Sequence, residues 1–109
     1  MPIIKLEEVP VTRTDWRESR VLVSPEVFGS KHLFVSLNQL FLGAAHENHS
    51  HSVDELLFIL EGEGEYEEEG VKHRIGPMSV VYIPRGRVHR TQSLGKTPLK
   101  LIVVKAPPE

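Results

Sequence analysis

Residues 43–62 read Gly43-Ala-Ala-His46-Glu-Asn-His49-Ser-His51-Ser-Val-Asp-Glu55-Leu-Leu-Phe-Ile-Leu-Glu-Gly62. Positions 49, 51 and 55 are all odd, so on a single strand His49, His51 and Glu55 would project from the same side. Alternate Cβ atoms of a strand lie roughly 7 Å apart, which lets two imidazoles lean toward one ion while a carboxylate completes a corner of its shell. The spacing indicates a candidate metal site. For a histidine taken alone, a structural or exposed role is the more common alternative.

A fourth candidate ligand lies elsewhere in the chain. His89 follows the turn signal Pro84-Arg-Gly86 and begins a different strand. A ligand from a second strand is what would close a site inside a barrel. Nitrogen and oxygen ligands without sulfur suit Mn, Fe, Co, Ni, Cu or Zn, and the sequence does not choose among them.

The hydrophobic pattern has a period of two rather than 3.6, which is typical of strands. No stretch of helical periodicity exceeds two turns, and glycine and proline punctuate the chain. Many short strands of this kind favour an all-β sandwich or barrel. We expect strands at residues 18–23, 32–42, 55–61, 78–83, 88–93 and 99–105, and a hairpin over residues 62–75 that turns near residues 68–70.

Composition excludes several classes of protein. The chain has 109 residues with no cysteine, so disulfides and thiolate metal sites are absent. Its 13 Lys and Arg against 15 Asp and Glu give no basic excess of the kind that nucleic-acid modules usually show. The N-terminal residues lack the apolar stretch of a signal peptide, and no apolar run is long enough to span a bilayer. We therefore expect a cytoplasmic protein that binds neither nucleic acid nor membranes.

Two separated motifs resemble those of the cupin family. The first cupin motif is a glycine, five residues, His-x-His, three or four residues, Glu, six residues and a glycine, and residues 43–62 meet every spacing. The second motif ends in Pro-x-Gly-x-x-His, which stands here at residues 84–89. The chain departs from the family where Met78-Ser79 replace a usual Gly-Asp and where Ser93 replaces a frequent Asn. Because Gly76-Pro77 lie just upstream, the turn is expected to open two residues early.

The resemblance implies one domain over residues 1–109, a double-stranded β-helix (jelly-roll) barrel. Its core would span about residues 33–104, with N-terminal strands within residues 5–23 and a loose C-terminal tail at residues 106–109. It also implies a homodimer and one divalent transition ion held by His49, His51, Glu55 and His89. Trp16, Val21 and Val23 are candidates for contact with the partner subunit.

The same resemblance implies an enzyme that acts on a small oxygenated metabolite. The ion would serve as a Lewis acid or as an oxygen-binding centre, in a reaction of the sugar isomerase or epimerase type or of the dioxygenase type. The alternative is a non-catalytic module that binds a sugar or a carboxylate through the same ion. The small-molecule ligand is expected to be anionic if the arginines near His89 attract it.

Further polar residues are candidates for the cavity. His46, Tyr82 and Gln92 are the candidate catalytic residues, and solvent exposure or a structural role is the alternative for each. Asn38 and Gln39 lie on opposite faces of one strand, so only one of them can face inward. The remaining candidates are Arg74, Arg85, Arg87 and Arg90.

Overall fold

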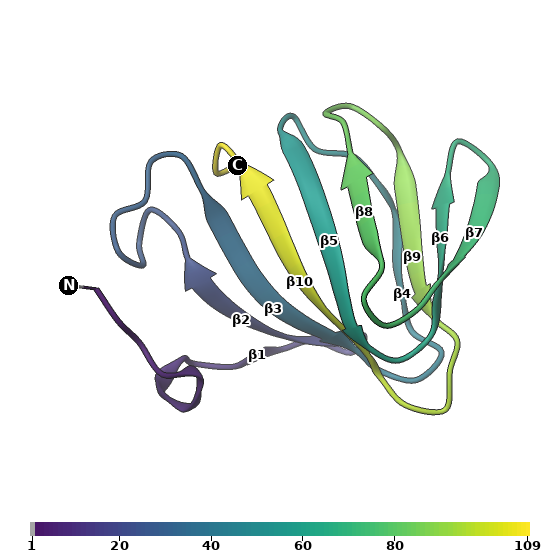
Figure 1. The fold of residues 1–109 in the computed structure, drawn as a ribbon, viewed down its shortest axis with the longest axis horizontal. Helices are drawn as coiled ribbons and strands as arrows, with labels where there is room; N and C mark the ends of the chain where they lie inside the picture. Colours follow the sequence, from purple (N-terminus) through teal and green to yellow (C-terminus); the bar gives the residue numbers. More distant parts are fainter. Residues whose placement is uncertain (1) are drawn as a thin grey trace.

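The computed structural model describes residues 2–109, and its regular secondary structure is almost entirely strand (Figure 1). A 3-10 turn, Leu6–Glu8, precedes ten strands. In chain order these strands are β1 (Thr12–Arg13), β2 (Arg17–Val23), β3 (Phe34–Leu40), β4 (Ala45–His49), β5 (Asp54–Glu61), β6 (Gly64–Glu68), β7 (Val71–Ile75), β8 (Val80–Ile83), β9 (His89–Ser93) and β10 (Leu99–Ala106). The expected all-β fold is confirmed.

The strands form two antiparallel sheets. One sheet has six strands in the order β1-β2-β3-β10-β5-β8, and the other has four in the order β4-β9-β6-β7. Figure 1 shows the six-stranded sheet sweeping across the view, with the four-stranded sheet beside and behind its right-hand end. Strands distant in sequence thus become neighbours, as β3 and β10 do, which is the arrangement of a jelly roll.

Alternation along each strand of the larger sheet separates a buried inner face from an outer face. The register places Ser36, Val103 and Leu57 in one inner row across β3, β10 and β5. The apolar core lies at the Leu99 end of these strands, where Leu40, Ile59 and Leu101 are buried. The interior toward the other end is lined by polar as well as apolar side chains and holds the candidate site.

Strand β4 was not among the expected strands. Its sequence, Ala45-His-Glu-Asn-His49, has no apolar alternation that would indicate a strand. It forms because its backbone pairs with β9, in the register His46 with Thr91 and His49 with His89. A strand whose stability comes from such a distant partner carries no local signal.

Gly62, the last glycine of the first motif, occupies a position that other residues would not tolerate. Its φ is +88°, and a Cβ placed there would lie 2.5 Å from the backbone oxygen of Pro98. A side chain would thus combine a left-handed backbone with a direct clash. The motif glycine lets β5 end close to the loop that precedes β10.

The turn before β8 opens at Gly76, two residues early, as expected. The Ser79 N–H donates to the Gly76 carbonyl over 3.1 Å, with Pro77 and Met78 as the central residues. Met78 has φ +69°, which corresponds to the position of a type II turn that favours glycine. Met78 is exposed, so its side chain adds little packing in return.

Replacing Met78 by glycine is expected to stabilise the fold by about 0.5–1 kcal/mol, because relief of the left-handed strain exceeds the added entropy of the unfolded chain. Chemical denaturation of the two proteins measures the difference. Met78→Ala is the matched control, since it removes the side chain and keeps the strain. A gain as large for alanine as for glycine would contradict this explanation.

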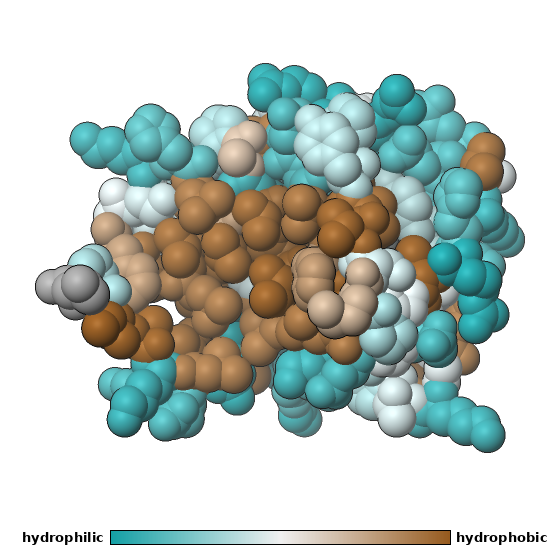
Figure 2. All heavy atoms as spheres, viewed as in Figure 1, coloured by the Kyte–Doolittle hydropathy of each residue, from teal (hydrophilic) through white to brown (hydrophobic). Residues whose placement is uncertain are grey.

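The outer face of the six-stranded sheet is apolar. The register aligns Val35, Val104 and Leu56 in one outer row and Leu37, Ile102 and Phe58 in the next. Figure 2 shows hydrophobic side chains gathered over this face, with hydrophilic residues around it. A contiguous apolar face of this kind is uncommon on the surface of soluble monomers.

Candidate metal centre

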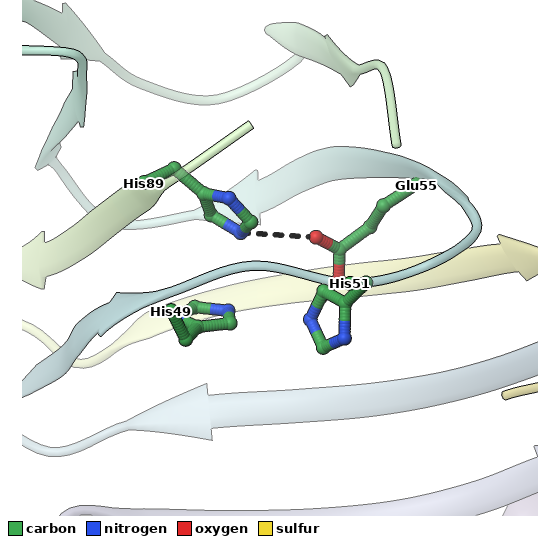
Figure 3. Close-up of side chains that lie close together, drawn as sticks. All are labelled: His49, His51, Glu55 and His89. Atoms are coloured by element: carbon green, nitrogen blue, oxygen red, sulfur yellow. Dashed lines mark ion pairs between the residues drawn. The ribbon is translucent and has the colours of Figure 1, made fainter. Parts of the chain in front are cut away.

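The fold brings His49, His51, Glu55 and His89 together. One potential ligand atom from each lies within 4.8 Å of the others (Figure 3). His49, His51 and Glu55 do not share a strand, however, so the expectation that a single strand would present all three was wrong. His49 ends β4, His51 lies in the following loop, and Glu55 lies in β5 of the other sheet. A loop that crosses between the sheets makes these side chains converge.

Hydrogen bonds between two loops fix this geometry. The Gly86 N–H donates to the His51 carbonyl over 2.8 Å, and the Arg85 N–H donates to Asp54 Oδ1 over 3.1 Å. The turn that precedes His89 is thereby held against the loop that carries His51. The proline and glycine of the second motif therefore help to position ligands from both motifs.

Each of the three imidazoles is oriented through its Nδ1 atom. Nδ1 of His49 lies 2.7 Å from the Glu47 carbonyl, and Nδ1 of His89 lies 2.8 Å from the Arg87 carbonyl. Nδ1 of His51 contacts the side-chain carboxylate of Glu109. A neutral imidazole that donates from Nδ1 keeps the lone pair on Nε2, so all three rings offer Nε2 to an ion.

The facing atoms are the ones that a cation would satisfy. Glu55 is 5% exposed and His89 is 2% exposed, and Glu55 Oε1 lies 3.1 Å from His89 Nε2. Within residues 2–109, His51 Nε2 has no hydrogen-bond partner, and Glu55 Oε1 has none apart from the close approach of His89 Nε2. Buried polar atoms left in this way are costly, and an ion among them removes the cost. Three imidazoles and one carboxylate therefore fit a divalent transition ion.

The environments of the histidines differ. Burial lowers the pKa of His49. For His89 burial acts in the same direction, but the adjacent Glu55 carboxylate and the Arg87 carbonyl raise its pKa overall. A cation in the cluster has to displace the proton of a protonated His89, so its affinity falls as the pH falls.

The C-terminal tail, expected to be loose at residues 106–109, contacts this cluster. The Ser52 N–H donates to Glu109 Oε2 over 3.0 Å, while Glu109 Oε1 contacts His51. Partial burial opposes ionisation of Glu109, but the bonds from Ser52 and His51 lower its pKa. Glu109 therefore remains a carboxylate at neutral pH and orients His51.

The cluster opens into a cavity of about 160 Å³ between the sheets. Of the residues expected to face inward, His46 and Asn38 line it. Gln39 lies on the outer face, where it lines a shallow surface hollow. Trp16 and Val21, the candidates for a subunit contact, also line the cavity.

The other candidate residues lie outside the cavity. Tyr82 is exposed and lines an open groove between β7 and β8, together with Arg74. Gln92 donates to the Gly43 carbonyl and accepts a hydrogen bond from Arg90. The arginines near His89 are each paired with a carboxylate at the surface: Arg85 with Asp54, Arg87 with Glu68 and Arg90 with Glu47. They offer no free cation at the site.

His46 is the one candidate catalytic residue that reaches the cluster. Its ring stacks on His49 with centroids 3.6 Å apart. Burial, then the charges of His49 and Arg17, lower the pKa of His46 to about 3. Its imidazole is neutral at physiological pH and can accept a hydrogen bond.

Sequence reasoning missed three residues that matter to the cavity and its ligands. Arg17 and Lys105 supply the cations that line the cavity, and Glu109 orients a ligand histidine. Arg17, Ser19 and Val21 are alternate residues of one strand and so face the same side, toward the cavity. The sequence of this short strand does not indicate which of its two faces is buried. No helix within residues 2–109 is long and apolar enough to cross a membrane.

The fold and this cluster define a jelly-roll protein with a group of three histidines and one glutamate that could hold a metal ion, and comparisons agree on the fold. The cupin domain model matches residues 41–105. This chain therefore belongs to the cupin family. An uncharacterized protein from Methanocaldococcus jannaschii is 27% identical over 112 residues, covering 99% of this chain and 90% of the other.

Solved structures share the fold at low sequence identity. KdgF from Halomonas sp. matches with a TM-score of 0.85 and 19% identity, covering 96% of this chain and 94% of that one. A predicted oxalate decarboxylase from Thermotoga maritima matches with a TM-score of 0.86 and 23% identity, covering 96% of this chain and 98% of that one. The polyketide cyclase RemF from Streptomyces resistomycificus matches with a TM-score of 0.84 and 18% identity, covering 97% of this chain and 79% of that one.

Proposed function

We propose that this cupin is a metal-dependent enzyme that acts on a small oxygenated metabolite. His49, His51, Glu55 and His89 would hold one divalent transition ion. The observation that carries the proposal is the convergence of three oriented Nε2 atoms and a buried carboxylate beside a cavity. When bound, such an ion supplies Lewis-acid chemistry, or oxygen binding if it is iron.

The residues of this chain have separate roles in the proposal. Glu55 is a ligand and is therefore not a free base. His46 is the one candidate base left beside the cluster, since Tyr82 and Gln92 lie outside the cavity, and its lowered pKa makes it a weak base. The cavity is smaller than the roughly 300–1,000 Å³ of drug-sized ligand sites, which favours a small metabolite.

The structural neighbours support an enzyme without choosing a reaction. One is described as a polyketide cyclase and another as a predicted oxalate decarboxylase. Sugar isomerisation or epimerisation and dioxygenation remain the proposed reaction types for this chain.

The test begins with the metal content of the purified protein and of protein reloaded with Mn, Fe, Co, Ni, Cu or Zn. Oxygen uptake is then measured with catechols, thiols and diketones, and epimer exchange is measured with sugars. Iron-dependent oxygen uptake supports the dioxygenase type, and epimer exchange supports the isomerase type. Failure to bind any of these ions would refute the proposal.

A non-catalytic binding module is the second candidate. The observation that favours it is the scarcity of acid–base groups, because His46 is the single candidate base that lines the cavity beside the ligands. Saturable binding of a sugar or carboxylate by the metal-loaded protein, without turnover in either assay, would support the module over the enzyme.

We also propose that a second copy of this chain covers the apolar outer face of the six-stranded sheet. Hydrophobic rows centred on Ile102 of β10 give such a contact its driving force.

Ile102→Glu is expected to convert a dimer to a monomer, because a two-fold contact buries the new charge once from each protomer. Light scattering after gel filtration measures the mass. Lys100→Glu, on the same face nearer the strand end, should remain dimeric. A monomeric wild type would contradict the proposal.

A further inference from the structure

The cavity contains one arginine whose charge is not matched by a carboxylate. Arg17 begins β2 and lines the cavity with Ser19 and Val21. Its Nε atom is buried and has no hydrogen-bond partner within residues 2–109, and none of the ion pairs formed by these residues includes it. Lys105, the other cation of the cavity, lies 3.6 Å from Glu109 Oε1.

An aromatic row connects Arg17 to the metal-ligand cluster. The Arg17 guanidinium lies 4.4 Å from the centroid of the Trp16 ring. Trp16 lies 4.5 Å from the His46 ring, and His46 stacks on His49 at 3.6 Å. A molecule in the cavity can therefore reach the cluster at one end and Arg17 at the other.

The stacking holds the guanidinium without using its hydrogen-bond donors. A partly buried cation that lacks a partner is unfavourable, because it loses hydration and gains no compensating charge. A planar guanidinium that rests on the face of an aromatic ring keeps its N–H groups available in the guanidinium's own plane. That fork matches the two oxygens of a carboxylate.

We propose that Arg17, seated on Trp16, binds a carboxylate group of the substrate while other oxygen atoms of the same molecule face the metal. This inference rests on the proposed function and narrows its substrate class to small carboxylic acids. One unmatched cation suits one carboxylate, whereas a phosphate dianion would bring a second negative charge.

A second polar group points to the same class. Asn38 is buried and lines the cavity, and its side-chain oxygen has no hydrogen-bond partner within residues 2–109. It can accept a hydrogen bond from a substrate hydroxyl. A small acid that also carries a hydroxyl would satisfy Arg17, Asn38 and the metal together, because the hydroxyl can donate to Asn38.

The experiment measures binding to metal-loaded protein by calorimetry. The probes are malonate, succinate and glutarate, the monoamide of each, and inorganic phosphate. The wild type is expected to bind one dicarboxylate at least about tenfold more tightly than its monoamide, because a charged pair exceeds a neutral hydrogen bond. In Arg17→Met this preference should fall below about twofold, and Arg17→Lys should keep part of it.

Arg90→Met is the matched control, because Arg90 pairs with Glu47 outside the cavity and its loss should leave the preference unchanged. Metal stoichiometry and thermal unfolding verify that each variant folds. If Arg17→Met does not fold, the change in preference is measured with Arg17→Lys instead. An unchanged preference in a metal-loaded Arg17 variant overturns the inference alone, as does stronger binding of phosphate or no binding of any dicarboxylate. Failure to bind metal refutes the proposed function and, with it, this inference.

Discussion

Replacing His49 or His51 by alanine is expected to weaken binding of a divalent transition ion by well over tenfold. Each histidine offers an oriented Nε2 atom to the cluster, and loss of even an outer-shell partner of a metal ligand costs roughly 10–100-fold. Competition with a chelating dye, for the ion that the protein binds best, measures the affinity. Thermal unfolding with and without that ion gives a second readout, because a bound ion stabilises the folded state.

His46→Ala is the critical comparison for this prediction. His46 stacks on His49 in the same cavity, so its loss perturbs the same packing without removing one of the four proposed ligands. We expect its effect on affinity to be much smaller. His73→Ala, at an exposed position on β7, should have none. A larger loss for His46 than for His49 would show that the proposed ligand set is wrong.

Replacing Glu109 by alanine is expected to lower metal affinity by roughly tenfold or more, although this residue cannot reach the ion itself. Its carboxylate fixes the Nδ1–H of His51 and thereby the direction of Nε2. Without it the ring can rotate and no longer presents Nε2 in a fixed direction. The same competition assay measures the change, and stoichiometric loading at high metal concentration shows that the site still forms.

Glu109→Gln distinguishes a role of the Glu109 charge in orienting His51 from a role in merely attaching the C-terminal tail to the loop that carries Ser52. The amide oxygen still accepts from His51 but lacks the charge, so we expect an affinity between those of the wild type and Glu109→Ala. Glu26→Ala removes an exposed carboxylate from a loop and should leave affinity unchanged. If Glu109→Ala bound metal as tightly as the wild type, the tail would have no role in orienting His51.

Turns and ligand identities were predictable because their signals are local. Motif spacing identified all four residues of the cluster before any strand had been placed, and Gly76-Pro77 predicted the early turn before β8. The origin of the cluster was not predictable in the same way. Alternation suggested one strand for residues 49–55, whereas the chain leaves β4 at His49 and enters the other sheet at residue 54.

The sequence by itself therefore determined an all-β cupin fold and a set of four potential ligands. Only the tertiary structure decided what surrounds them. Glu109 reaches His51 across 58 positions, and Arg17 lies beside His46 because β2 and β4 belong to different sheets that face one cavity. It also showed that Tyr82 and the arginines near His89 face away. Such contacts depend on the pairing of strands far apart in the chain, and no local pattern of residue types encodes that pairing.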